Sequence, residues 1–163
     1  TLMMTGCAGD SDPADVPQEL TDENLTELLC VYADTLAETY GADIDFTTPS
    51  FTDELAAYYE VSNFSSVDEI EQYNAAYMEP GVYDEKQIEY DFVEQDGKVY
   101  AVRGGRGYGY YGIDPSVWEK TADNQVRVQF CILGDPIDAF AEITFSDASG
   151  DWKISAAVLP DIE

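Results

Sequence analysis

The ten residues from Arg103 to Gly112 hold the side-chain types best suited to binding another molecule. They read Arg-Gly-Gly-Arg-Gly-Tyr-Gly-Tyr-Tyr-Gly, so five glycines separate two arginines and three tyrosines. Arginine and tyrosine are enriched at binding hot spots, because they supply donors and rigid amphipathic area. The alternative is a connecting loop whose tyrosines pack on a sheet while its arginines pair with nearby acids. We predict a binding loop for a carboxylate-rich peptide or an acidic partner, formed by Arg103, Arg106, Tyr108, Tyr110 and Tyr111.

The sequence contains no histidine, and this absence excludes several kinds of catalysis. Ser-His-Asp and Cys-His mechanisms need an imidazole base, and the usual zinc sites use histidine. A pair of acids facing each other in a cleft, one with a raised pKa, could still catalyse glycoside hydrolysis. Because the chain has 34 Asp and Glu residues, such pairs arise by chance. We therefore expect a protein that is not an enzyme and has no cofactor.

One acidic segment has part of the spacing of a calcium-binding loop. Its oxygen-bearing side chains occupy positions one, three, five and twelve of an EF-hand-like loop, and they are Asp43, Asp45, Thr47 and Glu54. Position six lacks the glycine that makes the sharp turn of a true EF-hand. We expect solvated surface acids here and no metal site.

Acidic residues dominate the chain and limit its choice of partners. The net charge is −27, and the first basic residue is Lys86. A field of this sign repels nucleic acid and anionic lipid, and it attracts cationic partners. The alternative is that the charge only keeps the protein soluble. In either case we expect no nucleic-acid partner.

Residues 2–7 read Leu-Met-Met-Thr-Gly-Cys, which resembles the lipobox of bacterial lipoproteins. The resemblance implies that a peptidase cuts before Cys7 and that the thiol carries a diacylglyceryl lipid. Residues 1–6 would then be the end of a signal peptide, and residues 7–20 a flexible lipid-anchored linker. We expect a location on the extracellular face of the bacterial cytoplasmic membrane, held there by the lipid alone. The alternative is a cysteine that stands near the terminus by chance.

The other two cysteines, Cys30 and Cys131, have two interpretations. They could form a disulfide in an oxidising compartment. We favour two small buried hydrophobic side chains, which is the commoner state of a free cysteine.

Helical patterns fill the first half of the chain. Thr21 is a candidate N-cap, and apolar residues recur after it at helical spacing, which predicts a helix ending at Gly41. A second helical stretch is predicted from Phe51 to Tyr59. A third begins at Ser66, where Glu69 completes a capping box, and runs to about Tyr77.

From Phe92 the apolar residues alternate with polar ones, which is typical of strands. Asp96-Gly97 separates two alternating runs and predicts a tight hairpin. Further alternating runs cover residues 126–132, 139–145 and 152–158. The pattern predicts an α+β fold in which the N-terminal helices pack on one face of a curved antiparallel sheet, in a single domain over residues 21–163.

Six aromatic residues either line a pocket between helices and sheet or belong to the core. They are Tyr58, Tyr59, Phe64, Tyr73, Tyr77 and Tyr83. Near-helical spacing favours the core, but buried tyrosine hydroxyls need partners.

Three segments occur in the same order as in a known family: Ser65–Tyr77, Glu94–Tyr100 and Ala148–Ile154, with Arg103–Gly107 between the last two. The chain thereby resembles the DL-endopeptidase inhibitor family of Gram-positive bacteria and, more loosely, cystatin/NTF2-like lipoproteins. The resemblance implies a cystatin/NTF2-like fold and a cell-wall hydrolase of the NlpC/P60 type as partner. Those hydrolases use a Cys-His pair, which this chain lacks. We expect an inhibitor that restrains such an enzyme; the alternative is capture of a small ligand or wall fragment in a closed apolar pocket between helix and sheet.

Overall fold

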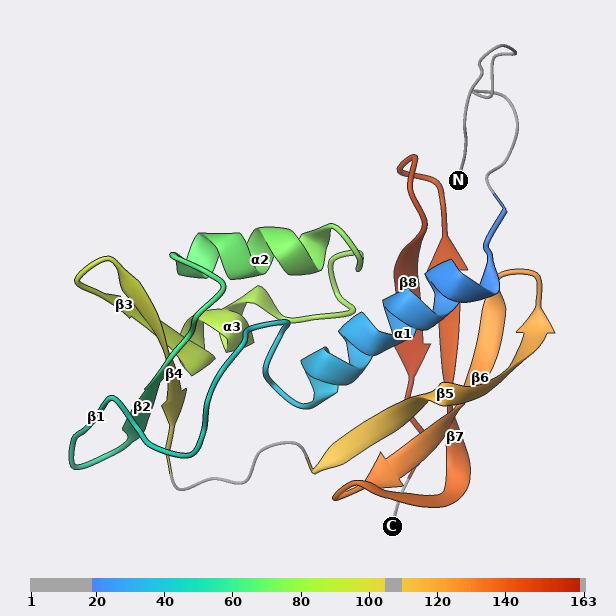
Figure 1. The fold of residues 1–163 in the computed structure, drawn as a ribbon. Helices are drawn as coiled ribbons and strands as arrows, with labels where there is room; N and C mark the ends of the chain where they lie inside the picture. The colour runs from blue at the N-terminus through green and yellow to red at the C-terminus, as the bar shows by residue number, and fades with distance from the viewer. Residues whose placement is uncertain (1–18, 105–109, 162–163) are drawn as a thin grey trace.

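The computed structural model describes residues 19–104 and 110–161, with three helices and eight strands in those ranges (Figure 1). The helices are α1 (Asp22–Leu36), α2 (Val67–Ala75) and α3 (Glu85–Asp91). The strands are β1 (Phe51–Thr52), β2 (Ala57–Glu60), β3 (Phe92–Gln95), β4 (Lys98–Arg103), β5 (Tyr111–Ala122), β6 (Gln125–Ile132), β7 (Asp135–Ser146) and β8 (Lys153–Val158). The predicted α+β class is confirmed.

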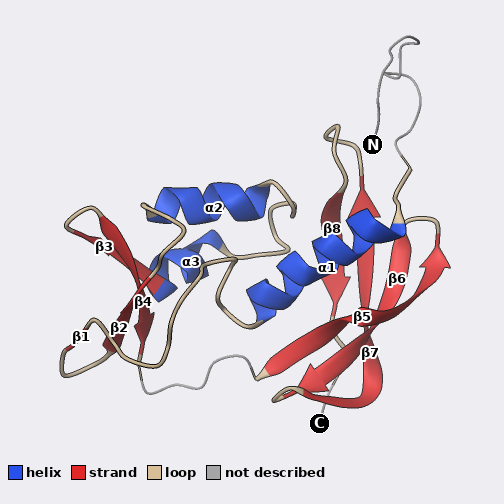
Figure 2. Cartoon of the chain, in the orientation of Figure 1, coloured by secondary structure: helices blue, strands red, loops and turns tan. Residues whose placement is uncertain are grey.

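The strands form two antiparallel sheets of four strands each (Figure 2). The larger sheet is a meander in the order β5-β6-β7-β8, and the smaller sheet has the order β1-β2-β4-β3. Helix α1 lies across one face of the larger sheet, whereas α2 and α3 lie beside the smaller one (Figure 1). Helices therefore cover antiparallel sheets, as expected, but the strands are divided between two sheets instead of forming one.

Helix α1 begins where the sequence predicts and ends earlier. The Thr21 hydroxyl accepts a hydrogen bond from the Asn24 N–H at 3.1 Å, which satisfies one free donor of the first turn. The helix ends at Leu36 rather than at Gly41. Positive φ angles at Glu38 and Tyr40, 63° and 53°, turn the chain before that glycine is reached.

One continuous core joins the two sheets. The buried face of α1 packs on the inward side of the larger sheet, and the residues involved include Leu25, Leu29, Val128, Phe130 and Ile143. Tyr40 continues this core towards the smaller sheet, because its ring meets Phe92 with centroids 6.2 Å apart. Met78 pairs with Ile154, so residues beyond α2 extend the β8 edge of the larger sheet.

The predicted helix from Phe51 to Tyr59 is wrong, since this segment forms the β1–β2 hairpin. The carboxylate of Asp53 accepts hydrogen bonds from the N–H groups of Leu55 and Ala56 and from the Tyr58 hydroxyl, at 2.8, 2.9 and 2.7 Å. Such local bonds offer the backbone an alternative to the helix. Phe51 then stacks on Tyr58, with ring centroids 4.5 Å apart, and this cross-strand pair favours the hairpin.

Two shorter signals are confirmed. Ser66 caps α2 by accepting the Glu69 N–H at 3.1 Å, while the Glu69 carboxylate accepts the Ser65 N–H, one residue earlier than in the standard box. Asp96 and Gly97 both have positive φ, which is the conformation that the predicted tight turn requires.

The cysteines differ from one another. Both are free thiols; Cys131 is buried as expected, but Cys30 is exposed on α1, so its predicted burial is wrong. Within residues 19–104 and 110–161, no helix has the length and apolar character needed to cross a membrane.

Candidate functional site

The residues of the predicted binding loop lie at two places in the fold. Arg103 ends β4 in the smaller sheet, whereas Tyr110 and Tyr111 begin the larger one. Arg106 and Tyr108 lie outside the described residues, as do Cys7 and the predicted linker. The described part of the loop therefore offers two separate sets of side chains.

Arg103 holds the end of α1 against β4. Its guanidinium donates to the carbonyl oxygens of Val102 and Glu38, at 3.1 and 3.0 Å. It also lies over the Phe46 ring, 5.2 Å from the centroid. A cavity of about 270 Å³ beside it is lined by Ala37, Thr39, Phe46, Tyr59 and Arg103. These contacts with backbone carbonyls and an aromatic ring point to an anchoring role for Arg103.

The two tyrosines stand exposed at one end of the larger sheet. Tyr110 and Tyr111 are 51% and 39% exposed, and their rings meet edge to face with centroids 4.8 Å apart. Tyr111 also rests on the buried Phe130 ring at 5.5 Å. The pair is thus supported from the core and presents aromatic surface without needing to rearrange.

Leu133, which the sequence patterns did not single out, lies beside them in the two-residue turn between β6 and β7. Its φ is 52° and that of Gly134 is 83°. Hairpin turns of this kind favour Asn, Asp or Gly at the first position, because other side chains crowd the backbone at positive φ. Leu133 is nevertheless 69% exposed, and its N–H donates to the Tyr110 carbonyl at 2.8 Å.

We call Tyr110, Tyr111 and Leu133 the sheet tip. Leu133 is strained and exposed, so packing in the core does not explain why an apolar residue stands at this position. Backbone strain of this kind is an observation from which a function can be inferred. The Leu133–Tyr110 hydrogen bond fixes the turn against the start of β5. The tip is therefore an ordered apolar projection. A Leu-Gly pair between two alternating runs is the sequence signal that could have identified its turn.

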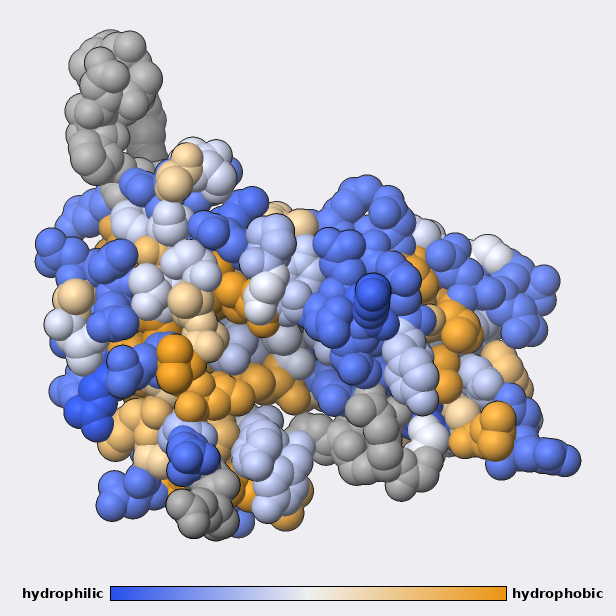
Figure 3. Space-filling model, turned by 180° about the vertical axis from the view of Figure 1, so that it is seen from behind, coloured by the Kyte–Doolittle hydropathy of each residue, from blue (hydrophilic) through white to orange (hydrophobic). Residues whose placement is uncertain are grey.

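Seen from behind, apolar side chains gather among hydrophilic ones over the half of the molecule that holds the larger sheet (Figure 3). On β7, Phe140 is 36% exposed, and the Arg127 guanidinium lies 4.3 Å from its ring centroid. Arg127 also pairs with Glu119 at 3.2 Å. This part of the sheet surface is already covered by its own charged side chains.

Most of the six aromatic residues pack against the core without being buried in it: Tyr59, Phe64, Tyr73 and Tyr77 are half-buried, and Tyr58 belongs to the β1–β2 hairpin. Tyr73 contacts Phe64 and Tyr77, with ring centroids 5.7 and 5.2 Å apart, and Tyr83 is buried. Buried side chains fill the space between α1 and the larger sheet. Beside them, a cavity of about 270 Å³ lies between α1 and the segments around Tyr77 and Trp152.

In the segment with calcium-loop spacing, the acidic side chains accept hydrogen bonds from other residues of the protein. Asp45 accepts hydrogen bonds from the N–H and hydroxyl of Thr47, and these bonds lower its pKa. Asp43 accepts the Ser62 hydroxyl at 3.0 Å. Among the described residues, no group of three or more Cys, Asp or Glu side chains has an arrangement that could hold a metal ion.

One pair of acids does face each other, across α2 and α3. Burial, a hydrogen bond with Glu89 and the negative charges of Glu89, Glu85 and Asp68 raise the pKa of Glu71 to about 7. Glycoside hydrolysis needs two carboxyl groups about 5 to 9.5 Å apart, with the sugar or a water between them. A carboxyl group with a raised pKa beside a second acid, one of the features expected for that chemistry, is therefore present at Glu71.

Comparison with known protein families gives no matching family model, and comparison with curated proteins gives no match. The likeness to the DL-endopeptidase inhibitor family stays a prediction that rests on the segments quoted above.

Proposed function

We propose that this protein is a membrane-anchored extracellular lipoprotein that binds a cell-wall DL-endopeptidase of the NlpC/P60 type and restrains it by occlusion. The sheet tip would fill the groove of the hydrolase, and the lipid on Cys7 would hold the inhibitor at the membrane. The observation that carries the proposal is Leu133, an exposed leucine held at positive φ next to two exposed tyrosines.

The sheet tip suits insertion into a groove because it is apolar and already ordered. Burying one leucine or aromatic side chain contributes about 1.5–3 kcal/mol. Rigid side chains lose little conformational entropy on binding, so more of that gain appears as affinity. Three such anchors at the centre of an interface match the usual pattern of binding hot spots.

Charge supports the choice of partner. The net charge of −27 favours encounter with a basic catalytic domain and speeds association at low salt. The acids also suppress binding to other acidic proteins. Salt-sensitive affinity is therefore part of the proposal.

The finer fold assignment is also a proposal. A helix across a four-stranded antiparallel meander supports a cystatin-like arrangement for α1 and β5–β8. The buried side chains that pack between α1 and this sheet support the inhibitor, whereas the pocketed NTF2-like alternative would use a cavity such as the one beside α1.

The test is calorimetric titration of the chain carrying Cys7→Ser against an NlpC/P60 catalytic domain from the same bacterium, at low and high salt. We expect binding that weakens at high salt and falls at least about tenfold with Leu133→Asn, which removes the apolar side chain but keeps the turn. Val158→Thr is the matched control, because Val158 is 64% exposed on β8, away from the tip. No heat at either salt, or equal losses for both variants, would sink the proposal.

A further inference from the structure

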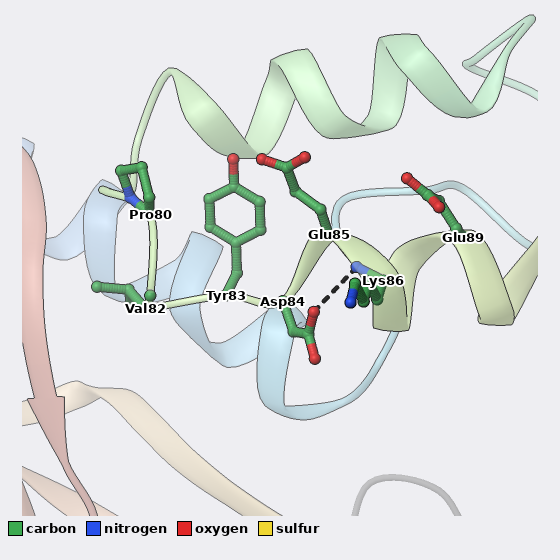
Figure 4. A pocket seen from close by; sticks show the side chains of 8 residues that line it. Pro80, Val82, Tyr83, Asp84, Glu85, Lys86 and Glu89 are labelled. Carbon is green, nitrogen blue, oxygen red and sulfur yellow. Dashed lines mark hydrogen bonds between the residues drawn. The ribbon is translucent and has the colours of Figure 1, made fainter.

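Helices α2 and α3 face each other through acidic side chains. Asp68 and Glu71 lie three residues apart on α2, and Glu85 and Glu89 lie four apart on α3, so each pair shares one helix face. Figure 4 shows Tyr83, Glu85 and Glu89 pointing towards α2, while Lys86 lies below them. The cavity drawn there has a volume of about 670 Å³, lined by residues 80–86 and Glu89. Water thus reaches one side of the contact.

Glu71 is half-buried on α2, beside this contact. Its Oε1 atom is shielded from solvent and has no hydrogen-bond partner. A proton on either acid would allow Glu71 and Glu89 to share a hydrogen bond. Because an unsatisfied buried oxygen is costly, a proton that gives the Glu71 carboxyl group a partner favours the packed state.

The groups around Glu71 reinforce this preference. From α3 it faces Glu89 and Glu85 and from α2 Asp68, and all three are close enough to disfavour its ionised form. The buried Tyr83 side chain precedes α3, and its pKa is raised by burial and by the charges of Glu85 and Glu71.

The remaining charged groups lie at the margins of the contact. Glu94 of β3 accepts the Val67 N–H at the start of α2, at 3.2 Å. Lys86 is the basic residue on the cavity wall, and its N–H is held by the Asp84 carboxylate at 2.9 Å. Acids therefore dominate the surroundings of Glu71 on both helices.

We propose that Glu71 and Glu89 form a proton-operated latch between α2 and α3, closed by one shared proton and loosened when that proton is lost. Above neutral pH two carboxylates meet across the contact, together with Glu85, and their repulsion weakens the packing of the two helices. The inference rests on the packing of α2 against α3, on the shielded oxygen of Glu71 and on the acids that surround it, and it does not depend on the proposed binding of a hydrolase.

The sign of the effect follows from proton linkage. The ordinary pKa of a glutamate is near 4.5, and that of Glu71 is about 7 in the folded protein. Between these values the folded state binds more protons than the unfolded state, so stability falls as pH rises through that window. The stabilisation by the shared proton is complete below the lower value and is lost above the upper one.

The test is hydrogen–deuterium exchange of the whole chain at pH 5.5, 7 and 8.5, corrected for the intrinsic pH dependence of exchange. We expect protection of residues 67–91 to fall at least about tenfold between pH 5.5 and 8.5, the factor that one pKa unit represents. Protection of β6 and β7 should stay constant.

Glu71→Gln supplies the decisive comparison, because glutamine has the same shape and donates permanently to Glu89. This variant should keep residues 67–91 protected at every pH. Glu54→Gln, an exposed acid in the β1–β2 turn, is the matched control and should behave like the wild type. Constant protection of the wild type, or an unchanged pH response in Glu71→Gln, would overturn the latch.

Discussion

Replacing Leu133 with asparagine should make the folded protein more stable, which is unusual for the loss of an apolar side chain. A residue with a Cβ costs about 1–2 kcal/mol in the left-handed conformation, and asparagine tolerates it much better. Leu133 has a φ of 52° and is 69% exposed, so its removal sacrifices little burial. We expect a gain of about 0.5–1 kcal/mol in the free energy of unfolding.

Urea denaturation at neutral pH measures this gain, and Leu133→Ala is the matched control. Alanine removes the same apolar atoms but keeps the strain, so its stability should stay within about 0.5 kcal/mol of the wild type. For a chain of this size, a gain of about 1 kcal/mol raises Tm by roughly 2–4 °C. If asparagine is no more stable than alanine, Leu133 is not strained, and the main argument for the sheet tip fails.

Two further changes test the packing around α2. Gly41→Ala should lose about 2–4 kcal/mol of unfolding free energy by urea denaturation, since φ is 86° and an added Cβ would collide with the Tyr73 ring; wild-type stability would contradict that contact. Glu71→Gln should exceed the wild type by about 1–2 kcal/mol at pH 8.5 and match it below pH 4.5. A full shift from 4.5 to about 7 corresponds to roughly 3 kcal/mol, reduced here because the side chain is partly in water. Equal stability at pH 8.5 would refute the assigned cost of ionising Glu71.

The sequence predicts best where a structure is decided by neighbouring residues. Thr21 and Ser66 cap helices, and Asp96-Gly97 makes a turn, because each motif acts within about four residues. The helix predicted from Phe51 to Tyr59 fails because Asp53 binds its own turn and because the segment pairs with β4, some forty residues away. Tertiary pairing of this kind outweighs weak helical spacing.

The candidate site was harder to predict than the fold. Tyr110 and Tyr111 were identified from residue type, and the structure adds that Tyr111 rests on the buried Phe130 and Tyr110 on Tyr111. Arg103 was predicted in the same loop, but its contacts with Glu38 and Phe46 give it an anchoring role that no local pattern indicates. Leu133 joins the site through a hydrogen bond between two segments that are separated by the length of β5 and β6.

The sheet tip and the proton-operated latch rest on different parts of the fold, which makes them separately testable. The tip is fixed by the pairing of β5, β6 and β7, whereas the latch holds α2 to α3 beside the smaller sheet. The Met78–Ile154 pairing links the two regions at β8, the edge strand of the larger sheet that is farthest from β5. Loosening α2 should therefore leave the β6–β7 turn in place, because strand pairing and the buried Phe130 support it independently. Leu133→Asn thus tests recognition without disturbing the acids, and Glu71→Gln tests the acids without altering the tip.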